Sequence, residues 1–219
     1  MISSIRAQGI VRSFGRARIL RNVDAEFCQG HVHALVGANG SGKTTFLRVV
    51  AGLLGSEQGS LRFGDLQILP GVPLPWNLRQ KIAYLGHESF AYPQLTGKEN
   101  LNLSAELYGV PNSGVDEILE RYQLTKAADR ALSTYSRGMV QRIALARLQI
   151  QKPEVLLLDE PTTGLDAHTH DLIINDIRDA AQRSCIVIVV THDPRDLSYF
   201  DGHIHRIDRG SIVAEGAVE

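Results

Sequence analysis

The sequence has few or none of the features that mark several specialised classes of protein. Only two cysteines occur among its 219 residues, too few for a disulfide scaffold. No apolar run approaches the roughly 18 residues that a membrane-spanning helix needs. The formal net charge is −1, so no basic field is available for a phosphate backbone, and we expect no nucleic-acid binding. These absences favour an ordinary globular domain.

The positions of the cysteines suit a reducing compartment. Cys28 and Cys185 lie in separate apolar segments without metal-ligand spacing, and we expect both thiols to be buried. The N-terminus lacks a charged segment followed by an apolar stretch, as a secretory signal would have. We therefore expect the chain in the cytosol, and any membrane-embedded part of its assembly should be another polypeptide.

A glycine-rich segment stands between a predicted strand, His31–Val36, and a predicted helix, Phe46–Ala51. It fits the phosphate-binding pattern G-x-x-x-x-G-K-[ST]. We expect nucleotide contacts from Gly37, Ala38, Asn39, Gly40, Ser41, Gly42, Lys43, Thr44 and Thr45. Backbone N–H groups would wrap the phosphates, Lys43 would reach the β and γ oxygens, and the Thr44 hydroxyl would ligate Mg²⁺. The expected ligand is a magnesium-bound nucleotide. The alternative is a flexible glycine-rich loop beside a solvated lysine, with no ligand.

Two acidic residues follow a second apolar segment. Val155–Leu158 has the pattern of a central parallel strand, and Asp159 and Glu160 come at its carboxyl end, where ligands bind in such sheets. Taken alone, this pair is also compatible with a solvated turn. Beside a phosphate loop, Asp159 is placed to hold Mg²⁺ and Glu160 to activate a water for attack on the γ-phosphorus.

A third segment carries a family resemblance. Tyr135, Ser136, Arg137, Gly138 and Met139, followed by the helix-like stretch 140–147, resemble the signature motif of ATP-binding cassette (ABC) ATPases. The order of motifs along nearly the whole chain is also similar to that family.

The resemblance implies further roles. Phe14 would stack on adenine, Asp166 would make a dimer contact in the D-loop, and His192 would be the switch histidine at the γ-phosphate. From the residues alone, Phe14 could equally be a buried strand aromatic, and His192 an ordinary histidine at the end of a strand.

The family pattern also implies the architecture. The expected fold is α/β, a P-loop NTPase core with a flanking antiparallel β subdomain and an inserted helical signature subdomain. A single ABC ATPase domain would cover 1–219, with the core and β subdomain at 1–86 and 151–219 and the helical subdomain at 87–150. Two copies would close head-to-tail around two ATP molecules, and Ser136 and Gly138 would then come from the opposite copy.

Local patterns fill in this outline. Apolar segments with turn signals at Ile5–Phe14, Val23–Phe27 and Ser60–Ile68 predict the antiparallel sheet. Thr96 and Glu99 match a helix capping box, and we expect a further helix at Asn112–Tyr122. We expect a further helix at His168–Gln182 and a further strand at Cys185–Val190. A terminal strand pair is expected at His203–Ile207 and Ile212–Ala214. Trp76 is interpreted as local packing.

Three positions depart from the family pattern. His87 stands where the family usually has a glutamine; its imidazole could accept a hydrogen bond or act as a metal ligand. Arg137 and Met139 replace the usual glycine and glutamine of the signature. These changes affect the expected coupling to partners more than nucleotide binding.

The resemblance implies an ATP-hydrolysing subunit that powers export through separate transmembrane subunits, held peripherally at the cytoplasmic face of the membrane. Gly86 and His87 resemble the haem-exporter ATPase of cytochrome c maturation, whereas the segment 135–139 is more similar to drug or polysaccharide exporters. The alternative is a soluble ABC ATPase acting as an assembly factor, for example in iron–sulfur cluster biogenesis. The interval between Lys43 and Ser136 is too short for the coiled coil of DNA-repair relatives.

Overall fold

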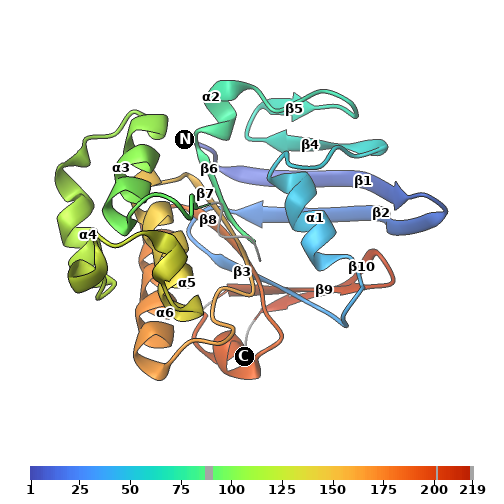
Figure 1. The fold of residues 1–219 in the computed structure, drawn as a ribbon. Helices are drawn as coiled ribbons and strands as arrows, with labels where there is room; N and C mark the ends of the chain where they lie inside the picture. The colour runs from blue at the N-terminus through green and yellow to red at the C-terminus, as the bar shows by residue number, and fades with distance from the viewer. Residues whose placement is uncertain (87–90, 201, 218–219) are drawn as a thin grey trace.

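The computed structural model describes residues 1–86, 91–200 and 202–217. Within these ranges the central feature is a six-stranded sheet, parallel except at one edge (Figure 1). Its strands, in spatial order, are β10 (Ser211–Ala217), β9 (Gly202–Asp208), β3 (Val32–Val36), β8 (Ile186–Val190), β7 (Val155–Asp159) and β6 (Ile82–Leu85). The carboxyl ends of the parallel strands open toward one edge, where ligands bind in such sheets.

A second, antiparallel sheet flanks the first. Its four strands within the described ranges are, in spatial order, β2 (Ala17–Cys28), β1 (Ser4–Phe14), β4 (Gln58–Phe63) and β5 (Leu66–Ile68). The predicted antiparallel sheet is thus confirmed. The segment Ser60–Ile68 forms two strands instead of one, because a turn at Gly64, with φ of +57°, reverses the chain.

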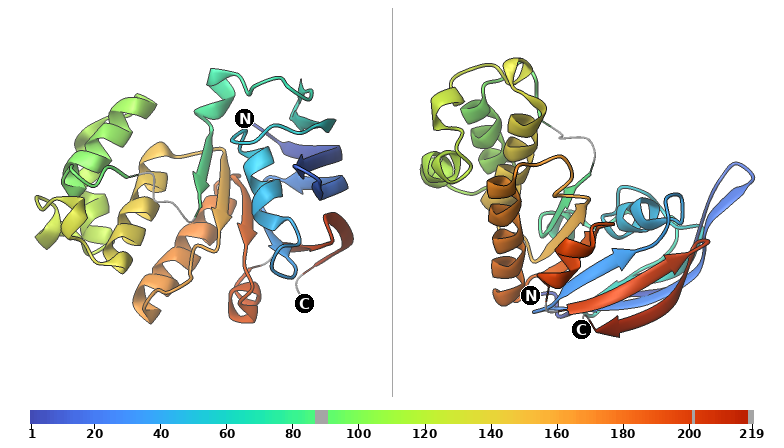
Figure 2. Two further views of the ribbon diagram at one scale, coloured as in Figure 1. Left: turned by 45° about the vertical axis from the view of Figure 1, so that its right-hand side comes forward. Right: turned by 90° about the horizontal axis from the view of Figure 1, so that it is seen from below.

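Helix α1 (Lys43–Val50) lies between the two sheets (Figure 2). Alternate residues of the central strands face opposite sides: Val155 and Leu157 of β7 join the hydrophobic cluster around α1, whereas Leu156 and Leu158 join the cluster on the other face. Burial on both faces explains why the strand reads as an uninterrupted apolar run.

The remaining helices lie around the two sheets, several of them on the other face. The described helices outside α1 are α2 (Trp76–Arg79), α3 (Gly97–Tyr108), α4 (Val115–Arg121), α5 (Arg137–Gln151), α6 (Ala167–Gln182) and α7 (Pro194–Ser198). The predicted capping box is confirmed, since Thr96 and Glu99 each accept a hydrogen bond from the other's backbone N–H. The predicted segment Asn112–Tyr122 consists of a 3₁₀ turn, Asn112–Gly114, followed by α4. Along the chain, α3, α4 and α5 all lie between β6 and β7.

One expectation about burial is wrong. Cys28 is exposed, because Phe27 points into the core and the next side chain of a strand must point outward. Trp76 is 67% exposed at the first residue of α2 and is not a packing residue of the core. Cys185 is buried as expected. Within the described ranges, no helix combines the length and the apolar character that a bilayer crossing requires.

Four histidines gather at the amino-terminal ends of β3 and β9. His33 Nδ1 lies 3.1 Å from His205 Nε2, and both side chains are buried. The rings of His31 and His203 pack edge to face, with centroids 5.2 Å apart. Burial, together with the charges of the neighbouring histidines, lowers the pKa of His33 from 6.5 to about 4.

Acidification should therefore destabilise the fold through His33. Above pH 6.5 both states carry a neutral imidazole; between pH 6.5 and about 4 the unfolded chain binds a proton that the folded chain excludes. The free energy of unfolding should fall through this window, by at most roughly 3 kcal/mol. Urea unfolding of wild type and His33→Gln across this range should show a weaker pH dependence in the variant. The exposed His168→Gln serves as control, and equal pH dependence in wild type and His33→Gln would refute this role.

Candidate functional site

The glycine-rich loop forms the turn between β3 and α1. Gly42 adopts a left-handed conformation, with φ of +112°, immediately before the helix, and no side chain caps the helix N-terminus. The first N–H groups of α1 and the positive end of its dipole therefore face the loop, an arrangement suited to an anion. This strand-loop-helix geometry is the one predicted from sequence.

Close packing restricts two glycines of the loop. A Cβ at Gly42 would lie 2.9 Å from Leu20 Cδ2 and 3.2 Å from the Ile19 carbonyl oxygen. At Gly37 it would lie 2.2 Å from the carbonyl oxygen of Ile207. The loop is thus wedged against the antiparallel sheet on one side and β9 on the other, which fixes its path.

A buried cation lies inside the loop. Lys43 is 7% exposed, and its Nζ donates to the carbonyl oxygens of Gly37 at 2.8 Å and Ala38 at 3.0 Å. The Ser41 hydroxyl oxygen is buried without a hydrogen-bond partner in the described part of the chain. A buried ammonium held by neutral carbonyls and an unsatisfied hydroxyl are both groups that a bound phosphate would stabilise.

The acidic pair and the predicted switch histidine meet at the ends of adjacent strands. Asp159 is the last residue of β7, is buried, and pairs in register with Val190 of β8. Glu160 follows, with its backbone N–H donating to the Val190 carbonyl oxygen at 2.9 Å. Its carboxylate oxygen Oε1 lies 3.2 Å from His192 Nδ1. Parallel pairing therefore brings together two residues separated by an entire βα unit.

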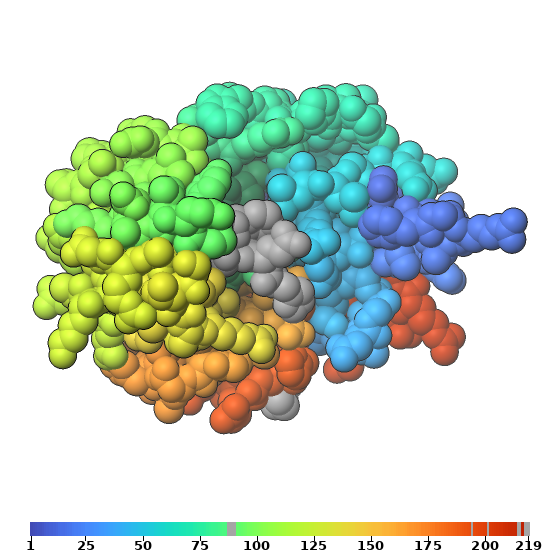
Figure 3. All heavy atoms as spheres, in the orientation of Figure 1, coloured from blue at the N-terminus to red at the C-terminus, as the bar shows by residue number. Residues whose placement is uncertain are grey.

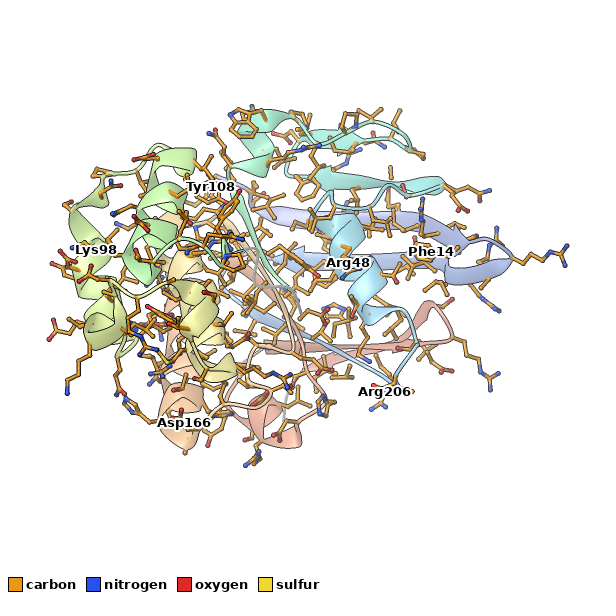
Figure 4. The ribbon with its side chains drawn as sticks, in the orientation of Figure 1. Phe14, Arg48, Lys98, Tyr108, Asp166 and Arg206 are labelled. Atoms are coloured by element: carbon orange, nitrogen blue, oxygen red, sulfur yellow. The ribbon has the colours of Figure 1, made fainter. Side chains whose placement is uncertain are left out.

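A cleft of about 490 Å³ joins the glycine-rich loop to Glu160. Its described lining is Phe14, Ile19, Asn39, Gly40, Gly42, Lys43, Thr44, Thr45 and Glu160. Phe14 is 51% exposed at the end of β1 (Figure 4). The Arg12 guanidinium lies 5.1 Å from its ring centroid. The alternative of a buried core aromatic is excluded, and Phe14 lines the cleft with about half of its side chain exposed.

The signature residues lie elsewhere. Ser136 caps α5, its Oγ accepting from the Met139 N–H at 3.4 Å, and does not line the cleft that holds the loop. Gly138 borders a second cleft that also includes Asp159 and Glu160. Asp166 caps α6 by accepting from the backbone N–H and hydroxyl of Thr169, each at 2.9 Å, which lowers the pKa of its carboxyl group (Figure 4). Asp166 is nevertheless exposed. His87 lies outside the described residues.

The donor set suits magnesium bound together with phosphate. Thr44 borders the same cleft as the loop, and Asp159 borders the adjoining one. In the part of the chain that the structure describes, no group of three or more histidine, cysteine or acidic side chains could hold a metal by itself. Magnesium is typically held by one or two carboxylates with substrate phosphates, so this sparse oxygen set fits it.

Sequence reasoning missed one group of polar residues. Asp196 of α7 is buried and bonded to Thr162, Thr191 and His170. Its position four residues after His192 was visible in the sequence, but an isolated aspartate gives no signal of burial. Only the packing of α7 reveals the cluster.

The parallel sheet, the loop wedged before α1 and the helical segment between β6 and β7 define a P-loop ATPase of the ATP-binding cassette class. The chain belongs to the ABC transporter family, whose model matches residues 20–163. It is an ATP-binding, ATP-hydrolysing subunit of such a transporter.

The chain is similar to ATP-binding proteins of bacterial drug resistance. It is 30% identical to the daunorubicin resistance ATP-binding protein DrrA3 of Streptomyces coeruleorubidus, over 99% of this chain and 69% of the relative. It is 29% identical to the linearmycin resistance ATP-binding protein LnrL of Bacillus subtilis, over 97% of this chain and 68% of the relative.

Solved structures support the fold. An ATP-binding subunit of an ABC transporter superposes with a TM-score of 0.88 at 21% identity, covering 100% of this chain and 90% of that one. A dimeric cassette in a post-hydrolysis state with ADP and Pi superposes with a TM-score of 0.86 at 23% identity, covering 98% and 99%.

Gly42→Ala should weaken MgATP binding. The added Cβ meets Leu20 Cδ2 at 2.9 Å, and a φ of +112° disfavours any L side chain, so the helix N-terminus must shift. A cost of about 1–2 kcal/mol corresponds to roughly a five- to thirtyfold rise in Kd, measurable by calorimetry. Gly71→Ala is the control: its φ is +77° with open space at Cβ, and it borders neither cleft described above. Equal Kd for Gly42→Ala and wild type would refute the assigned role of the loop.

Proposed function

We propose that this chain hydrolyses MgATP at the cleft beside the glycine-rich loop and thereby drives export through separate membrane subunits. The observation that carries the proposal is the contact between Glu160 and His192 at the edge of the cleft that Lys43 enters. A carboxylate and an imidazole beside a buried ammonium are suited to water activation next to a phosphate.

Each predicted residue has a role in this proposal. Phe14 would stack on the adenine, the loop residues 37–45 would bind the phosphates, and Thr44 with Asp159 would hold Mg²⁺. Bound magnesium would neutralise charge on the phosphate oxygens. Glu160 accepts the proton of the attacking water. When both ring nitrogens of His192 carry a proton, Nδ1 donates to Glu160 and Nε2 can donate to the γ-phosphate. His87 remains proposed as a metal or water contact.

A second copy is needed to complete the site. Ser136 does not line the cleft that holds the loop, and the described lining of that cleft contains no signature residue. We propose that Ser136 and Gly138 of an opposing copy close over the nucleotide in a head-to-tail dimer, with Asp166 at the contact. The division into a core at 1–86 and 151–219 and a helical subdomain at 87–150 belongs to the same proposal; it is supported by α3, α4 and α5 lying between two neighbouring strands.

Glu160→Gln should stop turnover without stopping binding. The amide keeps the shape of the side chain but cannot accept a proton, so kcat should fall about 10²–10⁴-fold. MgATP should remain bound and hold two copies together, detectable as a dimer by size exclusion with light scattering. Glu26→Gln is the matched control, since this exposed carboxylate pairs with Arg6 on the antiparallel sheet. Hydrolysis near the wild-type rate in Glu160→Gln would show that another group is the base.

Relatives favour export. Besides the two resistance proteins, the chain is 30% identical to the Nod factor export ATP-binding protein I of Paraburkholderia xenovorans, over 98% of this chain and 71% of that protein. These names do not support a haem cargo or the assembly-factor alternative. We propose export of an organic compound, selected by the membrane subunits.

A groove of about 580 Å³ offers a site for those subunits. Leu53, after α1, and Tyr92 and Leu107, before and on α3, border it and are each more than half exposed. Figure 3 shows the face on which α3, in green, and the residues after α1, in light blue, come to the surface. We propose that a cytoplasmic helix of the membrane subunit inserts its apolar side here, which would hold this chain at the cytoplasmic face.

Charges in the groove should release the chain from its membrane partner. Leu53→Asp combined with Leu107→Asp places two carboxylates where the proposed helix packs, so co-sedimentation with membranes containing the partner should be lost. ATPase activity of the isolated chain should persist. Val213→Asp, equally exposed on β10 and away from the groove, should leave sedimentation unchanged. If wild-type protein does not sediment with such membranes, the soluble assembly-factor alternative gains support instead.

A further inference from the structure

A buried carboxylate joins the two loops that carry Glu160 and His192. Asp196, on α7, is 1% exposed. Its Oδ2 accepts hydrogen bonds from the hydroxyl groups of Thr162, at 2.7 Å, and Thr191, at 2.8 Å. Its Oδ1 lies 2.8 Å from Nε2 of His170 on α6. A carboxylate removed from water to this extent requires such partners, and together they fix its orientation.

The partners of Asp196 flank the proposed reacting groups. Thr162 lies two residues after Glu160, and Thr191 directly precedes His192. Backbone pairing between β7 and β8 ends at Asp159 and Val190, followed by the bond from the Glu160 N–H to the Val190 carbonyl oxygen. Beyond that point, the Glu160–His192 contact and the hydrogen bonds through Asp196 link the two loops.

The Glu160–His192 contact is not held in place by burial of the two side chains alone. His192 is 62% exposed at its side chain, so this pair alone would be screened by water and mobile. Glu160 also has a φ of +52°, a conformation that costs a non-glycine residue about 1 kcal/mol or more. Surrounding structure must hold both residues in place.

We propose that Asp196 is a positioning residue for ATP hydrolysis: it binds the loop after β7 to the loop after β8 and so keeps Glu160 and His192 in contact. The inference rests on the proposed roles of Glu160 and His192. His170 extends this connection to α6, whose first turn is capped by Asp166. The hydrogen bonds of Asp196 therefore also link Asp166, the proposed dimer contact, to Glu160 and His192.

Asp176 provides a matched control. It is also a buried aspartate, 6% exposed, and bonds to Arg121 and to the Tyr122 hydroxyl. These partners join α6 to α4, and Asp176 borders neither the loop cleft nor the second cleft with Glu160. Replacing either aspartate by asparagine removes one buried charge and disturbs its hydrogen bonds, but only Asp196 touches the two loops.

The test compares Asp196→Asn with Asp176→Asn in steady-state ATP hydrolysis and thermal unfolding. We expect Asp196→Asn to lower kcat at least tenfold, with the KM for ATP changed less than twofold, because the phosphate loop is untouched. Asp176→Asn should lower the melting temperature to a similar or greater extent, with kcat within twofold of wild type. If both variants lose kcat in proportion to lost stability, the role of Asp196 is structural and the proposal fails.

Single hydroxyl deletions keep the proposal testable if Asp196→Asn does not fold. Thr162→Val and Thr191→Val each remove one bond to Asp196 and should each lower kcat, with unchanged KM. Where Asp196→Asn does fold, a double-mutant cycle with Thr162→Val should be non-additive, since both substitutions alter the same hydrogen bond. Wild-type kcat in both threonine variants overturns the proposal.

Glu160→Gln, assayed in parallel, distinguishes failure of the positioning role of Asp196 from failure of the proposed base. If it abolishes turnover while Asp196→Asn and the threonine variants retain wild-type kcat, only the positioning role is overturned. If Glu160→Gln hydrolyses ATP normally, the proposed base is wrong, and the positioning role that depends on it is overturned as well.

Discussion

Parallel pairing of β3, β8 and β7 is the constraint on which the rest of the structure depends. These neighbouring strands run in the same direction, so the loops that leave their carboxyl ends must meet at one edge of the sheet. The glycine-rich loop leaves β3, Glu160 leaves β7 and His192 leaves β8. The glycine-rich loop and Glu160, far apart in sequence, thereby line one cleft, and His192 contacts Glu160.

Burial on both faces stabilises this arrangement. One face of the sheet packs on α1 and the antiparallel strands, and the other packs on α5 and α6. The apolar side chains of β7 and β8 therefore hold the strands in a single register, because a shift by one residue would exchange their two faces. Such a rigid base allows unfavourable local features at the edge, including the positive φ of Glu160 and the buried ammonium of Lys43.

Polar contacts then organise what the sheet alone leaves free. Lys43 is held by carbonyl groups of its own loop, whereas the loops after β7 and β8 are joined by side chains, Glu160 to His192 and both threonines to Asp196. On the side of the helices, Asp176 joins α6 to α4 in a similar way. Buried carboxylates thus connect elements at two separate points of α6, one near its start and one in its middle.

Local patterns in the sequence determined the glycine-rich loop, the capping box at Thr96 and the strands β3, β7 and β8, because a phosphate loop, a helix cap and a doubly buried strand each impose residue types at fixed spacing. The resemblance of the segment 135–139 to the ABC signature also identified the fold class. The sequence could not show that Cys28 and Trp76 are exposed, that Phe14 opens on the cleft, or that Asp196 is buried between two loops. Those properties depend on which side chains from distant segments pack against each residue, and only the tertiary structure brings these segments together.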